Sequence, residues 1–102
     1  MKVVRFNTSL IPPEQKIPNM GWNEIQVKKN HPIFKDLYFE PRYYFVHSYH
    51  FKLVNPQEAL CTTQYGYDFV SGFCKDNIIG VQFHPEKSHK YGMKLMENFV
   101  KM

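Results

Sequence analysis

The sequence predicts a strand-rich α/β domain that ends in a single amphipathic helix. Three features predict this fold class: an aromatic and β-branched run at residues 43–51, a continuous apolar run at 77–83, and apolar residues at helical spacing beyond Ser88. Aromatic and β-branched residues favour strands. A continuous apolar run is typical of a strand that is covered on both faces. With 102 residues, the chain forms at most one domain.

The first third of the chain predicts short elements separated by loops. Residues 3–6 form a short apolar strand, and residues 7–16 form a loop that contains two consecutive prolines. A turn at Gly21 leads into a strand over residues 22–27. The segment that follows predicts one helical turn capped by Asn30.

The second half predicts neighbouring strands and the helix. Residues 59–65 and 68–75 flank Gly66 and predict a hairpin. From Ser88, a helix cap, apolar residues recur at the spacing of one helix face. These residues are Tyr91, Leu95, Met96, Phe99 and Val100. A Glu97–Lys101 pair is expected on the opposite face.

Composition limits the possible functions. The formal charge of +4 comes from scattered lysines, which predict a solvated surface rather than a nucleic-acid patch. The sequence contains no run of 18 apolar residues, so no membrane span is expected. The N-terminus does not resemble a signal peptide, so secretion is not expected. Cys61 and Cys74 form no Cys-x-x-Cys pair, so two free thiols in the cytoplasm are expected. His47 and His50, three apart on a predicted strand, should point to opposite faces, and no metal site or cofactor is expected.

The sequence "IIGVQFHPEKS" (78–88) places His84 and Glu86 where an apolar strand ends and a helix follows. Alternate residues on extended chain point to the same side, so the two side chains can share one cleft. A carboxylate beside an imidazole fixes its tautomer and stabilises the imidazolium, as in a nucleophile–base–acid triad. On spacing alone, a polar pair that seals the strand end is the more common arrangement.

Four ordered motifs favour the catalytic interpretation. "GVQFHPEKS" (80–88) resembles the motif that closes the triad of class I glutamine amidotransferases, which have a flavodoxin-like α/β fold. "IPNMGWNEI" (17–25), "YYFVHSY" (43–49) and "TTQYG" (62–66) are similar to motifs of one branch, the glutaminase subunit of imidazole glycerol phosphate synthase. The resemblance covers nearly the whole chain, residues 1–102. It implies a portion of a glutaminase that takes glutamine as substrate and supplies ammonia to a synthase or cyclase subunit for histidine biosynthesis.

The chain departs from the family pattern in two places. The family nucleophile is a Cys in a Gly-x-Cys-x-Gly elbow in the N-terminal half, and neither Cys61 nor Cys74 has that setting. The resemblance therefore implies the C-terminal half of the domain, without the nucleophile, and a chain that alone has no glutaminase activity. Asn19 replaces a His of the histidine branch. This favours a paralogue that supplies ammonia for amidating a surface-polysaccharide sugar, and a non-catalytic synthase-binding remnant is a further alternative.

The resemblance also implies roles for individual residues. His84 is the general base and Glu86 orients it. Tyr44 helps to gate the glutamine site, and Lys87 lies at the mouth of the ammonia passage, although a strand-core tyrosine and a solvated lysine are equally ordinary explanations.

Two further groups of residues complete the predicted site. One group borders bound glutamine through its backbone: His47, Ser48 and Tyr49. The other meets the synthase subunit: Met20, Gly21, Trp22 and Asn23. A partly exposed Trp beside Gly and Asn is a plausible interface anchor, whereas a core Trp is the alternative.

Overall fold

The structure is a computed structural model that describes residues 2–102. Its elements are eight strands, four short 3-10 turns and one helix. The strands are β1 (Lys2–Arg5), β2 (Asn19–Glu24), β3 (Gln26–Val27), β4 (Arg42–His47), β5 (Tyr49–Lys52), β6 (Ala59–Tyr65), β7 (Tyr67–Lys75) and β8 (Ile78–Val81). The helix α1 spans His89–Lys101, and the 3-10 turns are Thr8–Leu10, Pro32–Phe34, Pro56–Glu58 and Pro85–Lys87.

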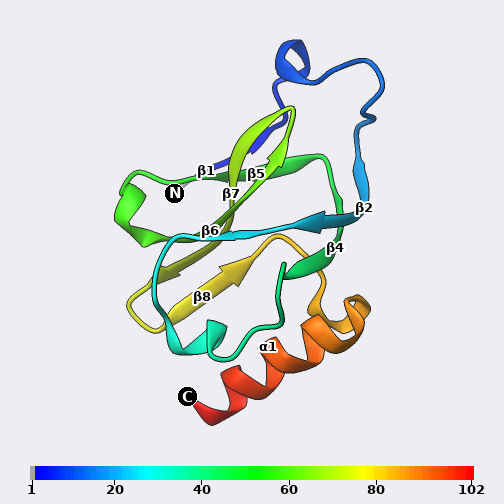
Figure 1. Ribbon diagram of the computed structural model, residues 1–102. Coiled ribbons are helices and arrows are strands. Elements are labelled where there is room, and N and C mark those ends of the chain that lie inside the picture. Colours follow the sequence, from blue (N-terminus) through cyan, green and yellow to red (C-terminus); the bar gives the residue numbers. More distant parts are fainter. Residues whose placement is uncertain (1) are drawn as a thin grey trace.

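All strand pairings within the described residues are antiparallel. Six strands form one sheet with the order β1-β5-β7-β6-β3, and β8 pairs with β7. Strands β2 and β4 form a second, two-stranded sheet. Figure 1 shows the long β6–β7 hairpin at the centre and α1 crossing one end of the strands. The predicted hairpin around Gly66 is confirmed.

The run at residues 43–51, expected as one strand, is two strands in two different sheets. β4 ends at His47 and pairs with β2, whereas β5 begins at Tyr49 and pairs with β1. The break at Ser48 turns the chain, so His47 and His50 both pack against Phe6, with ring centroids 5.1 Å away in each case. The expectation that these histidines point to opposite faces was therefore wrong, because strand alternation does not continue through a break.

The core consists mainly of aromatic rings between the two sheets. Tyr43 and Phe45 of β4 are fully buried, and Tyr43 stacks on Phe83 with centroids 4.1 Å apart. Phe83 also contacts Phe45 edge-on at 5.5 Å. These contacts hold the chain after β8 against β4. His84 follows Phe83 directly, so the packing of Phe83 in the core fixes the position at which His84 reaches the surface.

The apolar run at 77–83 forms a shorter strand than predicted, and it is not covered on both faces. β8 is four residues long, pairs with β7 alone among the described strands, and leaves Ile78 61% exposed. The helix is also oriented differently from the prediction. Leu95 is buried as expected, but Gly92 and Asn98 share its buried face, while Met96, Phe99 and Val100 are exposed. The predicted Glu97–Lys101 pair is present at 2.7 Å.

Three local details differ from the sequence prediction. Gly21 lies inside β2, paired with Phe45, rather than in a turn, and its φ of +130° is one that glycine adopts readily. His31, not Asn30, caps the 3-10 turn that follows, since its Nδ1 accepts the Ile33 N–H at 3.1 Å. Ser88 stands at the helix N-cap position, but its side chain makes no capping bond.

Candidate functional site

His84 leaves the core at the end of β8 and is held there by β4. Its N–H donates to the Tyr44 carbonyl at 2.9 Å, and the two residues form an isolated antiparallel bridge. The preceding residue, Phe83, is buried, so alternation along the extended chain directs the His84 side chain outward. The His84 backbone is therefore fixed, while its side chain is 39% exposed.

His84 and Glu86 are brought together, as the sequence predicted, although by a different backbone. His84 is extended, with φ −105° and ψ 96°, but Glu86 lies inside the 3-10 turn Pro85–Lys87 rather than on continued strand. The turn folds the Glu86 carboxylate back toward the imidazole, and His84 Nδ1 lies 3.4 Å from Glu86 Oε2. This separation exceeds the roughly 2.7–2.9 Å of a tight charge-assisted bond. Catalytic hydrogen bonds often shorten only when substrate binds.

The contact between Nδ1 and Glu86 leaves the other ring nitrogen free to act as a base. Since a carboxylate accepts only, Nδ1 carries the proton of the neutral imidazole. Nε2 then has a lone pair, and within residues 2–102 no hydrogen bond to it is found. The arrangement can accept a proton at Nε2 while Glu86 stabilises the resulting imidazolium.

Tyr44 and Lys87 both adjoin this pair. Tyr44 is half-buried, contributes its carbonyl to His84, and packs edge-on against Trp22 with centroids 6.2 Å apart. Lys87 is exposed, and its N–H donates to the His84 carbonyl at 3.0 Å. The turn therefore holds the Lys87 backbone against His84 while the lysine itself is exposed.

His47 has a different environment from the one the sequence suggested. It is 8% exposed, and its Nδ1 donates to the Tyr49 carbonyl at 2.8 Å. Because a carbonyl only accepts, Nε2 is the acceptor of the Asn19 amide at 3.3 Å, and Asn19 Oδ1 in turn accepts from Asn23 at 3.0 Å. Burial lowers the pKa of His47, an effect that the Tyr49 hydrogen bond opposes and the charges of His50 and His84 reinforce. His47 is thus a neutral, hydrogen-bonded core residue.

Ser48 and Tyr49 follow His47 at the break between β4 and β5. Ser48 is half-buried and its carbonyl accepts the Phe6 N–H at 3.0 Å, whereas Tyr49 is 49% exposed. The Tyr49 side chain therefore lies outside the core. The predicted backbone contacts of this stretch to glutamine stay a prediction.

In the segment Met20–Asn23, which the sequence assigned to an interface, Met20 and Trp22 are exposed, whereas Gly21 and Asn23 are half-buried. Met20 is 64% and Trp22 is 42% exposed, so Trp22 is not a core residue. The Trp22 ring stacks on His89 with centroids 5.7 Å apart and planes 12° apart. Through Tyr44 and His89, this exposed ring lies next to the strand-to-helix junction.

Cys61 and Cys74 lie in different environments. Cys61 is fully buried, and burial raises the pKa of its thiol to about 12 despite a hydrogen bond with Ser71. A thiol with such a pKa contains almost no thiolate at neutral pH. Cys74 is partly buried in β7, and its Sγ lies 3.5 Å from the Asp76 carbonyl. Both cysteines are free thiols.

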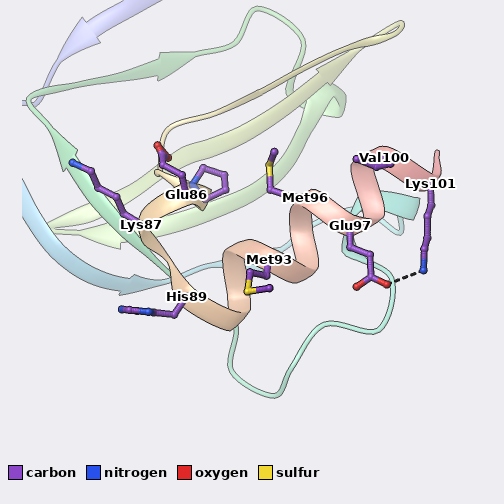
Figure 2. Close-up of a pocket in the computed structure, with 9 residues that line it drawn as sticks. Glu86, Lys87, His89, Met93, Met96, Glu97, Val100 and Lys101 are labelled. Atoms are coloured by element: carbon purple, nitrogen blue, oxygen red, sulfur yellow. Dashed lines mark hydrogen bonds and ion pairs between the residues drawn. The ribbon is translucent and has the colours of Figure 1, made fainter.

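A groove of about 600 Å³ runs along the exposed side of α1. Figure 2 shows Glu86 and Lys87 at one end and the Glu97–Lys101 ion pair at the other. The lining residues are Pro85, Glu86, Lys87, His89, Met93, Met96, Glu97, Val100 and Lys101. Glu86 lines the groove but His84 does not, so the groove contains only one member of the pair.

Residues 2–102 contain no group of three or more His, Cys, Asp or Glu side chains that could hold a metal ion. In the same range, no helix is long and apolar enough to cross a membrane.

The sequence prediction missed two polar residues around the site. Ser88 was expected only to cap the helix, but it is completely buried and bonds both Tyr44 and His84. Asn19 was noted only as a departure from a motif, but it is the buried partner of His47. The sequence does not indicate that Ser88 and Asn19 are buried, since both residues are polar and lie next to exposed residues.

Comparisons with known proteins agree with the motifs. The family described as glutamine amidotransferase class-I matches residues 2–102. Imidazole glycerol phosphate synthase subunit HisH 2 of Methanococcus maripaludis is 49% identical over 100 residues, covering 98% of this chain and 48% of that protein. Subunit HisH of Sulfurimonas denitrificans is 48% identical, with the same coverage of both chains. Subunit HisH 2 of Pseudomonas aeruginosa is 44% identical over 102 residues, or 49% of its length.

A solved structure agrees as well. A Thermoplasma acidophilum protein, provisionally described as one subunit of a GMP synthase, superposes with a TM-score of 0.69 and 25% identity. The match covers 98% of this chain and 47% of that chain. The chain therefore spans about half the length of the relatives it matches.

Proposed function

Because this chain belongs to the class-I glutamine amidotransferase family, we propose that it supplies the general base and its orienting acid to a glutaminase. The complete enzyme hydrolyses the side-chain amide of glutamine and passes the ammonia to a synthase. The observation that supports this most directly is the 3.4 Å contact between His84 Nδ1 and Glu86 Oε2 at an exposed strand-to-helix junction.

In the proposed mechanism, a Cys thiol from another segment transfers its proton to His84 Nε2 and attacks the amide carbon of glutamine. The tetrahedral intermediate collapses as the imidazolium returns the proton to the departing nitrogen, which leaves as ammonia. The glutamyl thioester is then hydrolysed by a water molecule that the same imidazole activates. Glu86 accepts the Nδ1–H throughout and stabilises each imidazolium.

We place the nucleophile outside residues 1–102, in an N-terminal half of the domain. Cys61 is sealed in the core and strongly disfavours its thiolate, and Cys74 lies in a strand without flanking glycines on both sides. The relatives are about twice as long as this chain, which supports a missing segment. The 102-residue chain alone is accordingly expected to be inactive.

The proposed partner is the synthase or cyclase subunit that receives ammonia. Relatives named imidazole glycerol phosphate synthase subunit support histidine biosynthesis as the pathway. Met20 and Trp22 provide exposed apolar side chains for that subunit. The half-buried Gly21 and Asn23 complete the proposed interface segment. The proposal keeps backbone contacts to glutamine from His47, Ser48 and Tyr49, a gating role for Tyr44, and Lys87 at the ammonia passage. The two free thiols support a cytoplasmic location.

The first test uses a hybrid protein, in which this chain is fused to the portion of the Methanococcus maripaludis relative that it does not match. Ammonia release from glutamine is measured for the chain, the hybrid and hybrid variants, each with that relative's synthase partner. We expect turnover only in the hybrid, a loss of about a thousandfold in kcat for His84→Ala, and about a hundredfold for Glu86→Gln. Glu14→Gln, at an exposed loop position, is the matched control and should not change kcat. Normal turnover by the isolated chain, or by the His84→Ala hybrid, would refute the proposal.

A second test separates an enzyme segment from a non-catalytic binding remnant. Trp22→Ala should abolish capture of the synthase by the chain, whereas Phe39→Ala removes an equally aromatic, 88% exposed side chain and should leave capture intact. Capture that depends on Trp22 while the hybrid lacks turnover would favour the remnant. Turnover that increases with an acceptor other than the histidine-pathway intermediate would favour the paralogue.

A further inference from the structure

The bridge between Tyr44 and His84 is incomplete as a strand pair, and a serine hydroxyl completes it. In a hydrogen-bonded antiparallel pair, the two residues exchange two backbone N–H to C=O bonds. Here His84 N–H donates to the Tyr44 carbonyl at 2.9 Å, but the return bond is not direct. Tyr44 N–H donates to Ser88 Oγ at 2.9 Å, and Ser88 Oγ–H donates to the His84 carbonyl at 2.6 Å. The hydroxyl thus occupies the position of the missing backbone bond.

The insertion of this hydroxyl has a geometric consequence. A direct pair would place the His84 carbonyl on the Tyr44 N–H, whereas here the Ser88 oxygen stands between the two groups and bonds both. The His84 carbonyl also accepts the Lys87 N–H at 3.0 Å, so the hydroxyl and the 3-10 turn together fix the peptide that carries His84 into Pro85. The orientation of that peptide determines how Glu86 meets the imidazole.

The Ser88 hydroxyl is buried, so its hydrogen bonds to Tyr44 and His84 are shielded from water. Ser88 has no exposed surface, so water cannot replace its bonds. It stands where a helix N-cap residue would bond the first turn of α1, yet it makes no such bond. Its own backbone remains tied to the turn and the helix, through its N–H to the Pro85 carbonyl at 3.0 Å and its carbonyl to the Gly92 N–H at 3.2 Å.

We propose that Ser88 is a positioning residue: its buried hydroxyl sets the spacing between Tyr44 and His84 and thereby orients the His84 imidazole toward Glu86. A contribution of Ser88 to catalysis rests on the proposed function, but the positioning itself does not depend on turnover. Ser88 acts through His84 and contacts no reacting atom.

The test uses the 102-residue chain and a matched buried serine. Ser71 is also fully buried, and its hydroxyl accepts from Thr63 at 2.9 Å inside the six-stranded sheet. Ser88→Ala should increase amide hydrogen exchange of Tyr44 by about tenfold or more, because that N–H loses its acceptor. Ser71→Ala should change it by less than about threefold. Ser88→Cys, which keeps a weak donor and acceptor of similar size, should give an intermediate rate and covers the case in which the alanine variant does not fold.

A second readout follows the imidazole itself. In the wild-type chain and in Ser71→Ala, Glu86→Gln should shift the ¹⁵N resonance of His84 Nδ1. In Ser88→Ala, or in Ser88→Cys if the alanine variant is unfolded, the same substitution should produce less than half of that shift. A Tyr44 amide that exchanges freely in the wild type, or an undiminished His84 response without the Ser88 hydroxyl, would overturn the proposal. Because neither readout requires glutamine turnover, failure here is distinguishable from failure of the glutaminase proposal.

Discussion

Two histidines on neighbouring elements show how environment separates a structural role from a chemical one. His47, at the end of β4, is 8% exposed, and both ring nitrogens are engaged by Tyr49 and Asn19. His84, beside the middle of the same strand, has a side chain that is 39% exposed and is engaged at Nδ1 by Glu86. The core favours the neutral form of the His47 ring, whereas the partly exposed His84 ring keeps a lone pair on Nε2.

The two histidines also differ in the contacts that hold them in place. The His47 ring packs among Phe6, Phe45 and Phe69, with centroids 5.1–5.3 Å away. The His84 ring has no such aromatic neighbours among the described contacts, and only its backbone is anchored, through Tyr44 and Ser88. Substitutions should therefore affect stability at His47, activity at His84, and both where the anchor of the junction is altered.

The largest expected effect is on the free energy of unfolding, and it comes from Gly92, where α1 packs against the turn that follows His84. A Cβ built on Gly92 would lie 1.7 Å from the Pro85 carbonyl oxygen and 2.6 Å from its carbon, both of which are backbone atoms. Gly92→Ala must therefore push α1 away from the turn that carries Glu86. We expect a loss of about 3 kcal/mol or more in the free energy of unfolding, measured by urea denaturation.

The neighbouring helix position provides the control. Met93 is 75% exposed, so Met93→Ala should change the free energy of unfolding by less than about 0.5 kcal/mol. If Gly92→Ala were as stable as Met93→Ala, the close approach of helix and turn would be wrong, and with it the explanation of how Glu86 is held.

The next effect compares the histidines directly. His47→Ala removes a buried ring and leaves the Asn19 amide and the Tyr49 carbonyl without a partner, so we expect a loss of about 3 kcal/mol. His84→Ala removes an exposed ring with one long contact, so the loss should be below about 0.5 kcal/mol. The same urea titration measures both. Equal losses would mean that the His84 ring is part of the core and is not available for chemistry.

The His84–Glu86 pair was predictable because its position depends on a local pattern. An apolar run that ends at His-Pro-Glu predicts one buried residue, Phe83, followed by an outward histidine, and both are found. The proximity of Glu86 was predicted from extended chain, whereas a 3-10 turn produces it. The predicted α/β class, a strand-rich portion of a class I glutamine amidotransferase domain with a C-terminal helix, is confirmed by the family and structural matches. The roles of the individual site residues stay predictions.

The environment of His47 was not predictable, because it depends on contacts between distant segments. Periodicity suggested one strand from residue 43 to 51, and only the pairing of β4 with β2 and of β5 with β1 shows that the chain turns at Ser48. The helix illustrates the same limit. The helix is present, but its buried residues are Gly92, Leu95 and Asn98, and most of the predicted apolar stripe is exposed, namely Met96, Phe99 and Val100. A stripe predicts that a face is apolar and does not identify what covers it.

The smallest expected effect, and the most selective, is the pH dependence of stability. Burial lowers the pKa of His47 in the folded chain below the unfolded value of about 6.5. As the pH falls below about 6.5, the unfolded chain binds a proton that the folded chain does not bind until its lower pKa is reached. The free energy of unfolding is therefore fully retained above pH 6.5 and decreases below it.

Urea titrations at pH 7.5 and at steps below 6.5 measure this dependence, with His47→Gln and His84→Gln compared in parallel. Gln at position 47 cannot titrate, so the decrease between these pH values should become smaller in that variant. Gln at position 84 leaves His47 and its burial intact, so the decrease should persist. If instead His84→Gln removed the dependence and His47→Gln kept it, the buried neutral ring and the exposed ring would have been assigned the wrong way round.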